Sequence, residues 1–144
     1  MSIGNDWVVL DTNIWIFGLR NQPDRPACTR LLRCLNRMYV RVPRQVLLEL
    51  RANLNIEEMN DLFRQWSYYP TRVDIRWDKV SSALVEKYQK MGCKLGDAAV
   101  SAHVEAMGIK ILVSENRDFL EEIRGLSFRV LRAEDALREL EDIA

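Results

Sequence analysis

The sequence contains little cysteine and only one histidine. Its 144 residues include Cys28, Cys34 and Cys93, an odd number without the CxxC spacing of many zinc sites or a disulfide framework. The single histidine, His103, excludes metal sites that are built from several imidazoles. Because free thiols are typical of a reducing compartment, we expect a cytoplasmic protein.

Long apolar runs and nucleotide-binding glycine motifs are also missing. No stretch approaches the ~18–20 apolar residues that a membrane-spanning helix needs, and residues 1–6 lack the features of a secretion signal. We therefore expect neither membrane association nor secretion. The absence of GxGxxG argues against a dinucleotide-binding domain. With 48% hydrophobic and 29% charged residues, the chain is expected to form a single domain over residues 1–144.

Neither sign of charge is in excess over the whole chain, which has 21 basic and 21 acidic residues. The distribution is uneven, because residues 1–51 hold eight arginines and four acidic residues and residues 52–144 carry the compensating negative charge. The first third is therefore the more favourable place for a polyanion to bind, although solvated helix faces would give the same pattern.

Short apolar runs alternate with helical periodicities along the chain. Strands are predicted at residues 7–10, 39–42, 73–77, 109–113 and 128–131, and helices at 12–19, 27–38, 44–54, 56–67, 78–91, 97–107, 116–124 and 133–143. This alternation predicts an α/β fold in which helices cover both faces of a parallel sheet. Ligands of such sheets bind beyond the carboxyl ends of the strands, where Asp11, Ser114, Asn116 and Asp118 are expected.

The acidic residues each have an ordinary explanation when taken alone. Asp11 suits a helix N-cap, Glu49 a surface position of an amphipathic helix, and Asp97 the first turn of a helix. Asn116 and Asp118 would also suit a simple turn. Together, however, they form an oxygen-rich set that suits Mg²⁺. Without a cation such carboxylates would repel one another, and their pKa values would be raised.

Four motifs together carry a family resemblance. They are VVLDTNIWI at residues 8–16, VLLEL at 46–50, GDAAVSAHVEAMG at 96–108 and ILVSENRDF at 111–119. In this order and at these separations, residues 6–132 resemble PIN-domain ribonucleases, and most of all the VapC toxins of bacterial toxin–antitoxin pairs. The resemblance implies a PIN-like domain with a five-stranded parallel sheet in the order 3-2-1-4-5 and helices on both faces.

The resemblance also implies roles for individual residues. Asp11, Glu49 and Asp97 match the three core acids of a Mg²⁺ or Mn²⁺ site, and Asn13 and Ser114 match polar positions beside it.

The fourth acidic position departs from the family pattern. Thr-x-Asp-x-Asp-Phe in the family falls on Ser114, Asn116, Asp118 and Phe119, so an amide replaces one of the acids. Either Asn116 or Asp118 would complete the metal shell, and the number of ions, one or two, stays open.

The activity implied is that of a metal-dependent endoribonuclease, which hydrolyses RNA phosphodiester bonds to leave 5′-phosphate and 3′-hydroxyl ends. The catalytic residues would be Asp11, Glu49, Asp97 and Asp118. RNA needs basic side chains at the rim of an acidic site, and the candidates near the motifs are Arg20, Arg44, Arg51 and Arg117. The resemblance further implies a homodimer and a cognate antitoxin that blocks the site.

Two other functional classes share some of these sequence features. A receiver-like domain would need paired acids after the first strand, a phosphoacceptor aspartate after the third and a lysine after the last, and only Asp11 fits. A PIN-like domain that processes RNA, or that binds RNA or a partner without cutting, stays open because Asn116 removes one charge.

Overall fold

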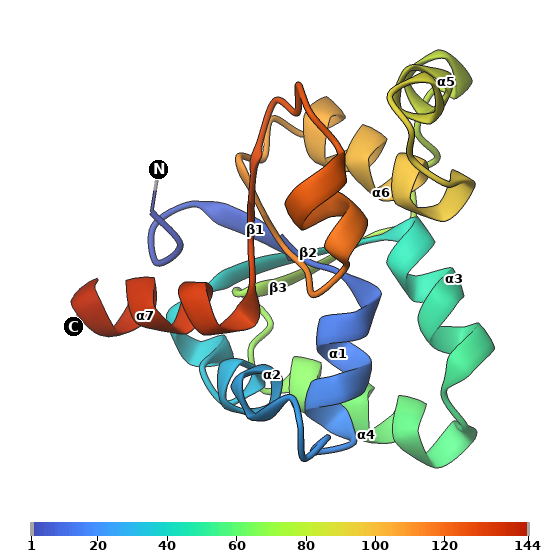
Figure 1. The fold of residues 1–144 in the computed structure, drawn as a ribbon. Helices are drawn as coiled ribbons and strands as arrows, with labels where there is room; N and C mark the ends of the chain where they lie inside the picture. The colour runs from blue at the N-terminus through green and yellow to red at the C-terminus, as the bar shows by residue number, and fades with distance from the viewer. Residues whose placement is uncertain (1, 144) are drawn as a thin grey trace.

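Parallel strands form the centre of the molecule (Figure 1). The structure, a computed structural model, describes residues 2–143, with side chains described except at positions 122, 142 and 143. Five strands form one sheet in the order β3-β2-β1-β4-β5, and each pairing is parallel. The strands are β1 (Trp7–Leu10), β2 (Tyr39–Pro43), β3 (Val73–Arg76), β4 (Ile111–Val113) and β5 (Arg129–Leu131). The predicted fold class and strand order are confirmed.

Helices cover both faces of this sheet, as predicted. They are α1 (Thr12–Leu19), α2 (Pro26–Leu32), α3 (Arg44–Asn53), α4 (Ile56–Ser67), α5 (Ser82–Lys90), α6 (Leu95–Ala106) and α7 (Ala133–Ile143). In the view of Figure 1, α1, α2, α4 and α7 lie below the sheet and α5 and α6 lie above it. Within residues 2–143, no helix is both long and apolar enough to cross a membrane.

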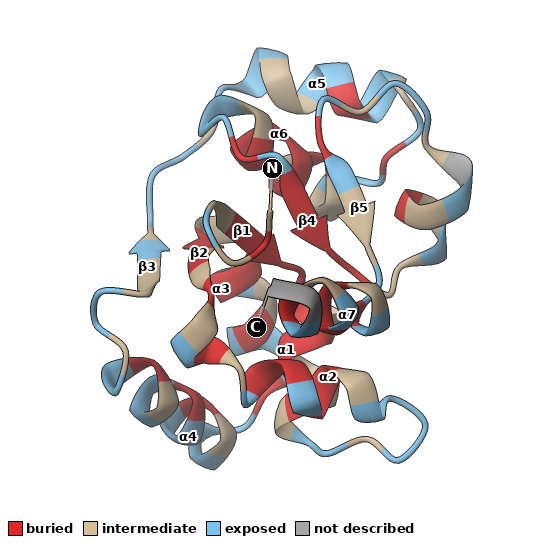
Figure 2. Cartoon of the chain, turned by 90° about the vertical axis from the view of Figure 1, so that its left-hand side faces the viewer, coloured by how far each residue is buried: buried red, intermediate tan, exposed pale blue. Residues whose placement is uncertain are grey.

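The neighbouring strands β1 and β4 are the most deeply buried part of the sheet (Figure 2). All three residues of β4 are buried, whereas β3, at one edge, is half-buried or exposed. The continuous apolar runs of β1 and β4 are what strands covered on both faces require.

The register of β1 and β4 determines which side chains meet at their carboxyl ends. Leu10 is paired with Val113, so the next residues along the two strands, Asp11 and Ser114, emerge side by side. The Asp11 amide donates to the Val113 carbonyl at 2.8 Å, and the Ser114 amide donates to the Leu131 carbonyl at 2.9 Å. The sheet therefore fixes the backbone beneath both side chains.

Several helix boundaries differ from the predictions. The helix expected over 27–38 ends at Leu32, and the chain continues as a 3₁₀ turn, η1 (Leu35–Arg37), although the side chains of Leu35 and Met38 remain buried. Helix α5 begins at Ser82 rather than at 78, because the Ser81 side chain caps it by accepting from the Leu84 amide at 3.2 Å.

Two further boundaries lie near the predicted site. Helix α6 begins at Leu95, two residues earlier than predicted, which makes Asp97 its third residue. The segment expected as a short helix over 116–124 is a π-helical turn, η2 (Asp118–Glu122).

Gly18 allows α1 and α2 to approach closely. A Cβ atom at this position would lie 2.5 Å from Leu32 Cδ1 and 2.8 Å from the Cys28 carbonyl oxygen. Because carbon atoms and backbone oxygens do not approach so closely, a larger residue would force the two helices apart.

Candidate functional site

Asp11 lies at the carboxyl end of β1 and is also the N-cap of α1. Its side chain is only 5% exposed. Oδ1 accepts a hydrogen bond from the Thr12 amide and Oδ2 accepts one from the Ser114 hydroxyl, both at 2.8 Å. The pKa of Asp11 is raised to about 6, mainly by burial and to a smaller extent by the charges of Glu49 and Asp97, against the two hydrogen bonds, which lower it. Capping and membership of an acidic site are therefore compatible at this position.

Ser114 connects β4 to the first turn of α1. It is fully buried, and its hydroxyl oxygen accepts from the Asn116 amide at 3.0 Å and from Asn13 Nδ2 at 3.4 Å. Asn13 Oδ1 in turn accepts from the Glu115 amide at 3.2 Å. The predicted polar residues Asn13 and Ser114 thus lie beside Asp11 and join α1 to the loop that follows β4.

Glu49 reaches the site from α3. Thr12 Oγ1 donates to Glu49 Oε2 at 3.0 Å, so one residue holds Glu49 through its side chain and Asp11 through its backbone. Burial raises the pKa of Glu49, as does the charge of Asp97, while hydrogen bonds from Thr12 and Gln45 lower it. A Cβ atom at Gly96 would lie 3.2 Å from Glu49 Oε1, so the glycine leaves room for this carboxylate.

Asp97 lies in the first turn of α6 and contacts the amide that replaces a family acid. Asn116 Nδ2 donates to Asp97 Oδ2 at 3.0 Å, while Asn116 Oδ1 accepts from the Asp118 amide at 3.0 Å. Burial raises the pKa of Asp97, and so does the charge of Asp118, whereas the bond from Asn116 and the charge of Lys94 lower it. Asn116 therefore both orients Asp97 and forms the turn that leads into η2.

Thr12 and Gln45 were not identified as site residues from the sequence. Thr12 directly follows Asp11, and a hydroxyl beside a strand-end acid is a signal that could have been used. Gln45 stands four residues before Glu49, which on a helix places the two side chains next to each other.

The arrangement of these acids bears on whether a cation would fit. Among the described side chains, no three acidic, histidine or cysteine groups converge closely enough to form a ready metal cage. Instead, Asp11, Glu49 and Asp97 each accept a hydrogen bond from a neutral side chain. The atoms available as metal ligands are carboxylate, amide and hydroxyl oxygens. This set of ligands fits Mg²⁺ or Mn²⁺ and does not fit softer metals.

Two of the candidate RNA-binding arginines have partners within the protein. Arg20 Nε pairs with Glu58 Oε2 at 2.9 Å. The Arg44 guanidinium lies over the Trp77 ring, 4.7 Å from its centroid. These contacts hold both side chains between neighbouring elements.

The other two candidates are exposed. Arg51 lies on the outer surface of α3. Arg117 directly follows Asn116 and lies 3.5 Å from Glu121 on the same turn. Arg117 is therefore the candidate with the most direct connection to Asp97.

Comparison with known proteins adds a family match to this geometry. The sequence matches the family described as PIN domain over residues 8–124. A search of curated proteins finds no match. Among solved structures, one chain of VapBC2 from Rickettsia felis, in a crystal structure bound to a DNA fragment from their promoter, is 19% identical in sequence with a TM-score of 0.56. The match covers 86% of this chain and 98% of that chain, and at this identity it is a likeness of fold.

Proposed function

The chain belongs to the PIN-domain family, and from that premise we propose that it is a divalent-metal-dependent endoribonuclease. The observation that carries the proposal is that three partly or fully buried acids lie near one another: Asp11 after β1, Glu49 in α3 and Asp97 in α6. Their side chains are close enough for the charges of Glu49 and Asp97 to raise the pKa of Asp11. Burying like charges together is costly, and a cation would offset that cost.

Asp11, Glu49 and Asp97 would hold the Mg²⁺ or Mn²⁺ ion, and Asn116 or Asp118 would complete its shell. Such an ion lowers the pKa of a water molecule and offsets the charge that develops on phosphoryl oxygens during in-line attack.

The chain's own polar residues orient the acids for this chemistry. Ser114 and the Thr12 amide hold the two oxygens of Asp11, the Thr12 hydroxyl holds one oxygen of Glu49, and Asn116 holds one oxygen of Asp97. Each of these three acids also has an oxygen that can still bind a second partner, because a carboxylate oxygen has two lone pairs. The acids are therefore positioned before substrate arrives, which favours catalysis.

Cleavage of a labelled RNA by the purified chain tests the proposal. We expect cutting with Mg²⁺ or Mn²⁺, none with EDTA, and products with 5′-phosphate ends. Asp97→Asn should lower the rate by at least about 100-fold, as expected for loss of a ligand at a metal site. The matched control is Asp61→Asn, which neutralises an exposed acid of α4 that pairs with Arg64. Equal rates for the two variants would contradict the assignment of Asp97.

We further propose that the nuclease is the toxin of a toxin–antitoxin pair, acts in the cytoplasm and forms a homodimer. The likeness of fold to a VapBC2 chain supports the toxin–antitoxin part of this proposal. Expression of the chain alone in a bacterial host should arrest growth, and Asp11→Asn should relieve the arrest. Growth without arrest would point to a nuclease with another role, and sedimentation of the purified chain measures its oligomeric state.

A second candidate function is a PIN-like module that binds RNA or a partner without cutting. The observation in its favour is Asn116, whose neutral amide contacts Asp97 where the family pattern has an acid. The same cleavage experiment separates the two functions, because this module would bind RNA and leave it intact with either ion.

A further inference from the structure

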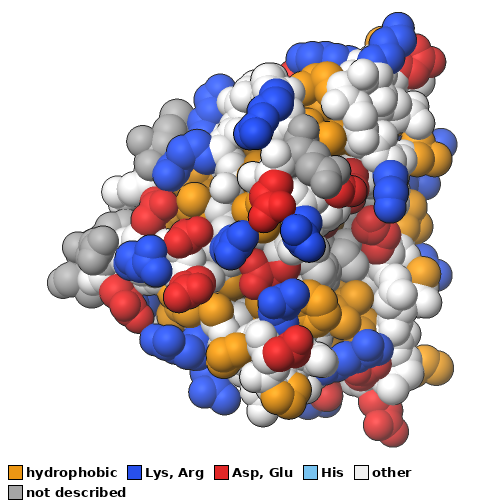
Figure 3. Space-filling model, in the orientation of Figure 1, with side chains coloured by type: hydrophobic (Ala, Val, Ile, Leu, Met, Phe, Trp, Pro, Cys, Tyr) orange, Lys and Arg blue, Asp and Glu red, His pale blue; other side chains and the backbone are white. Residues whose placement is uncertain are grey.

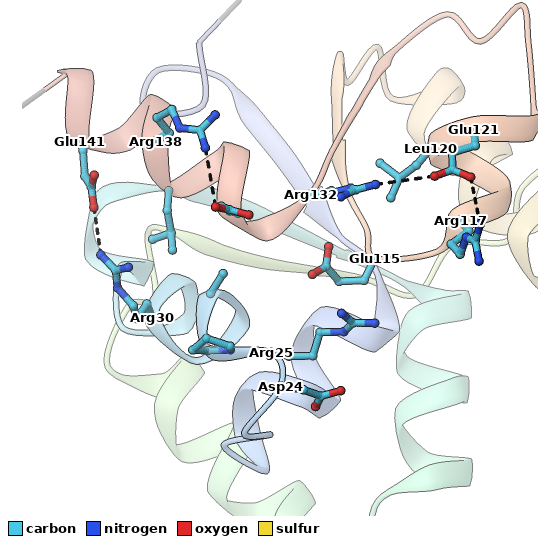
Figure 4. Close-up of a pocket in the computed structure, with 14 residues that line it drawn as sticks. Asp24, Arg25, Arg30, Glu115, Arg117, Leu120, Glu121, Arg132, Arg138 and Glu141 are labelled. Atoms are coloured by element: carbon cyan, nitrogen blue, oxygen red, sulfur yellow. Dashed lines mark hydrogen bonds and ion pairs between the residues drawn. The ribbon is translucent and has the colours of Figure 1, made fainter.

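A groove lies beside the acidic site, between the start of α2 and the segments that follow β4 and β5 (Figure 4). Its volume is about 720 Å³, which is within the range of sites that hold a sizeable ligand. Among the described residues that line it, the basic ones are arginines: Arg25, Arg30, Arg117, Arg132 and Arg138. We call it the arginine groove.

Acidic side chains also line the arginine groove, so its charge is mixed. Figure 3 shows acidic and basic side chains alternating on the face that contains it. Arg30 pairs with Glu141 at 3.1 Å, and Arg138 pairs with Asp135 at 3.2 Å and with Glu134 at 3.7 Å. These two arginines, on the outer side of the groove, each have their own acidic partner.

The arginines nearer the acidic site are less well paired. Arg117 and Arg132 share a single acid, Glu121, at 3.5 and 3.7 Å, and all three side chains are exposed. Arg25 has no ion pair among the described residues and lies 5.6 Å from the centroid of the Phe17 ring. Long, exposed ion pairs contribute little stability, so an incoming anion can replace Glu121 at small cost.

The arginine groove borders the loop of residues 115–117, which contacts the acidic site. Glu115 lines the groove, and its amide donates to Asn13 beside Ser114. Arg117 also lines the groove and directly follows Asn116, which donates to Asp97. In Figure 4, the charged ends of Arg25, Glu115 and Arg132 face the same space. An anionic chain bound there would lie next to the loop that holds Asn116 against Asp97.

We propose that the arginine groove binds the phosphate backbone of single-stranded RNA next to the bond to be cut, with Arg25, Arg117 and Arg132 contacting phosphates. This inference rests on the proposed nuclease function. The planar fork of an arginine fits phosphate oxygens through two hydrogen bonds, and single strands are flexible enough to follow a curved groove. Glu121 competes with the phosphates for Arg117 and Arg132, which keeps binding weak and sensitive to salt.

Binding is measured separately from cleavage in the full chain with Asp11→Asn, so that the RNA stays intact. Fluorescence anisotropy with a short labelled single-stranded RNA, over a series of salt concentrations, gives the affinity and its salt dependence. Adding Arg25→Gln and Arg132→Gln should weaken binding by roughly ten-fold for each arginine. The slope of log affinity against log salt should fall by about 0.7 for each phosphate that the variant no longer neutralises.

Glu121→Gln provides a test in the opposite direction. Neutralising the acid that Arg117 and Arg132 share should tighten RNA binding several-fold, because the two arginines then have no internal competitor. Removal of an exposed acid that has no such role would change affinity much less, and Asp61→Asn measures that background. If Glu121→Gln binds RNA no better than Asp61→Asn, the competition that we infer does not exist.

The matched control for the two groove arginines is Arg33→Gln with Arg64→Gln, two exposed arginines that do not line the groove. Weaker binding in this control together with unchanged binding in the groove variant would overturn the proposal and leave the groove to a protein partner. A chain with native Asp11 that fails to cut RNA, while the groove variants still lose affinity, would reject the nuclease function and keep the groove as an RNA site.

Discussion

The acidic site, formed by Asp11, Glu49 and Asp97, lies next to the arginine groove, but the two regions differ in the sign and the burial of their charges. In the acidic site, the charges have one sign, Asp11 is almost fully buried, and its hydrogen-bond partners are neutral donors such as Ser114. In the groove, charges of both signs alternate, and the pairs Arg30–Glu141 and Arg132–Glu121 are exposed to water. In the acidic site, burial raises the pKa of Asp11 to about 6.

Charge is costly in the buried acidic site and inexpensive in the exposed groove. A buried carboxylate among other acids destabilises the metal-free fold, because water is excluded and repulsion is not screened. An exposed ion pair is screened and exchanges partners freely. The first region is therefore suited to hold a cation, and the second is suited to exchange an internal acid for a phosphate.

The largest change in the free energy of unfolding is expected for Asp11→Asn, in the acidic site. Because the folded protein raises the pKa of Asp11 from 3.8 to about 6, the folded state binds the proton more tightly than the unfolded state does. The wild-type protein should therefore lose stability as pH rises from about 4 to just above 6. The asparagine variant lacks this loss, and above pH 6 its advantage should reach up to about 3 kcal/mol.

Chemical denaturation of both proteins without divalent ions, at several pH values between 4 and 8, measures this effect. The two free energies of unfolding should be close near pH 4 and diverge as pH rises. Parallel curves of the free energy of unfolding against pH would show that folding does not raise the pKa of Asp11. Addition of Mg²⁺ should stabilise the wild type more than the variant, because bound ligand stabilises the folded state.

Ser114→Ala should have the next largest effect. It removes the hydroxyl that donates to Asp11 Oδ2, and a buried carboxylate that loses a donor costs about 1–3 kcal/mol. The loss should be greater at pH 7.5 than at pH 5, because Asp11 is charged at the higher pH. Ser67→Ala is the control, since the Ser67 hydroxyl donates to the Arg64 carbonyl in an exposed region. Equal losses at the two pH values would mean that Ser114 acts through packing alone.

The smallest effect is expected in the groove. Arg30→Gln breaks an ion pair with Glu141 in which both side chains are more than half exposed, at 61% and 58%. We expect the free energy of unfolding to change by less than about 0.5 kcal/mol. A double-mutant cycle with Glu141→Gln gives the coupling energy directly, and a value above about 1 kcal/mol would show that the groove is held together by its ion pairs.

Most of the sheet could be predicted because its signals are local. The apolar runs of β1 and β4 are ended by Asp11 and Ser114, and the structure places these two residues side by side. Helix ends were harder to predict. Leu35 and Met38 have helical spacing from Leu31, but their side chains are buried although the backbone beyond Leu32 is not α-helical. Periodicity reports which side chains are buried and not the backbone geometry that buries them.

The contacts of the acids could be predicted only in part. Glu49 stood out as a carboxylate within an aliphatic run, but its bond to Thr12 joins α1 and α3, and no local pattern encodes such a contact. The arginine groove had even less signal in the sequence. Arg25 and Arg132 line it from segments at opposite ends of the chain, and each is an ordinary surface arginine in its own segment. Of the arginines that line the groove, only Arg117, which lies within the ILVSENRDF motif, was proposed from the sequence.

Gly18 has a consequence for how the acidic site and the arginine groove are placed relative to each other. The close approach that it permits packs α1 firmly against α2, and α1 begins at the Asp11 cap while α2 begins beside Arg25. The packing of the two helices therefore links the position of Asp11, at the start of α1, to that of Arg25, at the start of α2. For an RNA strand bound by Arg25, the packing of α1 against α2 would set the distance from the bound phosphate to the bond that is cut. The sequence of the strand would not affect this distance.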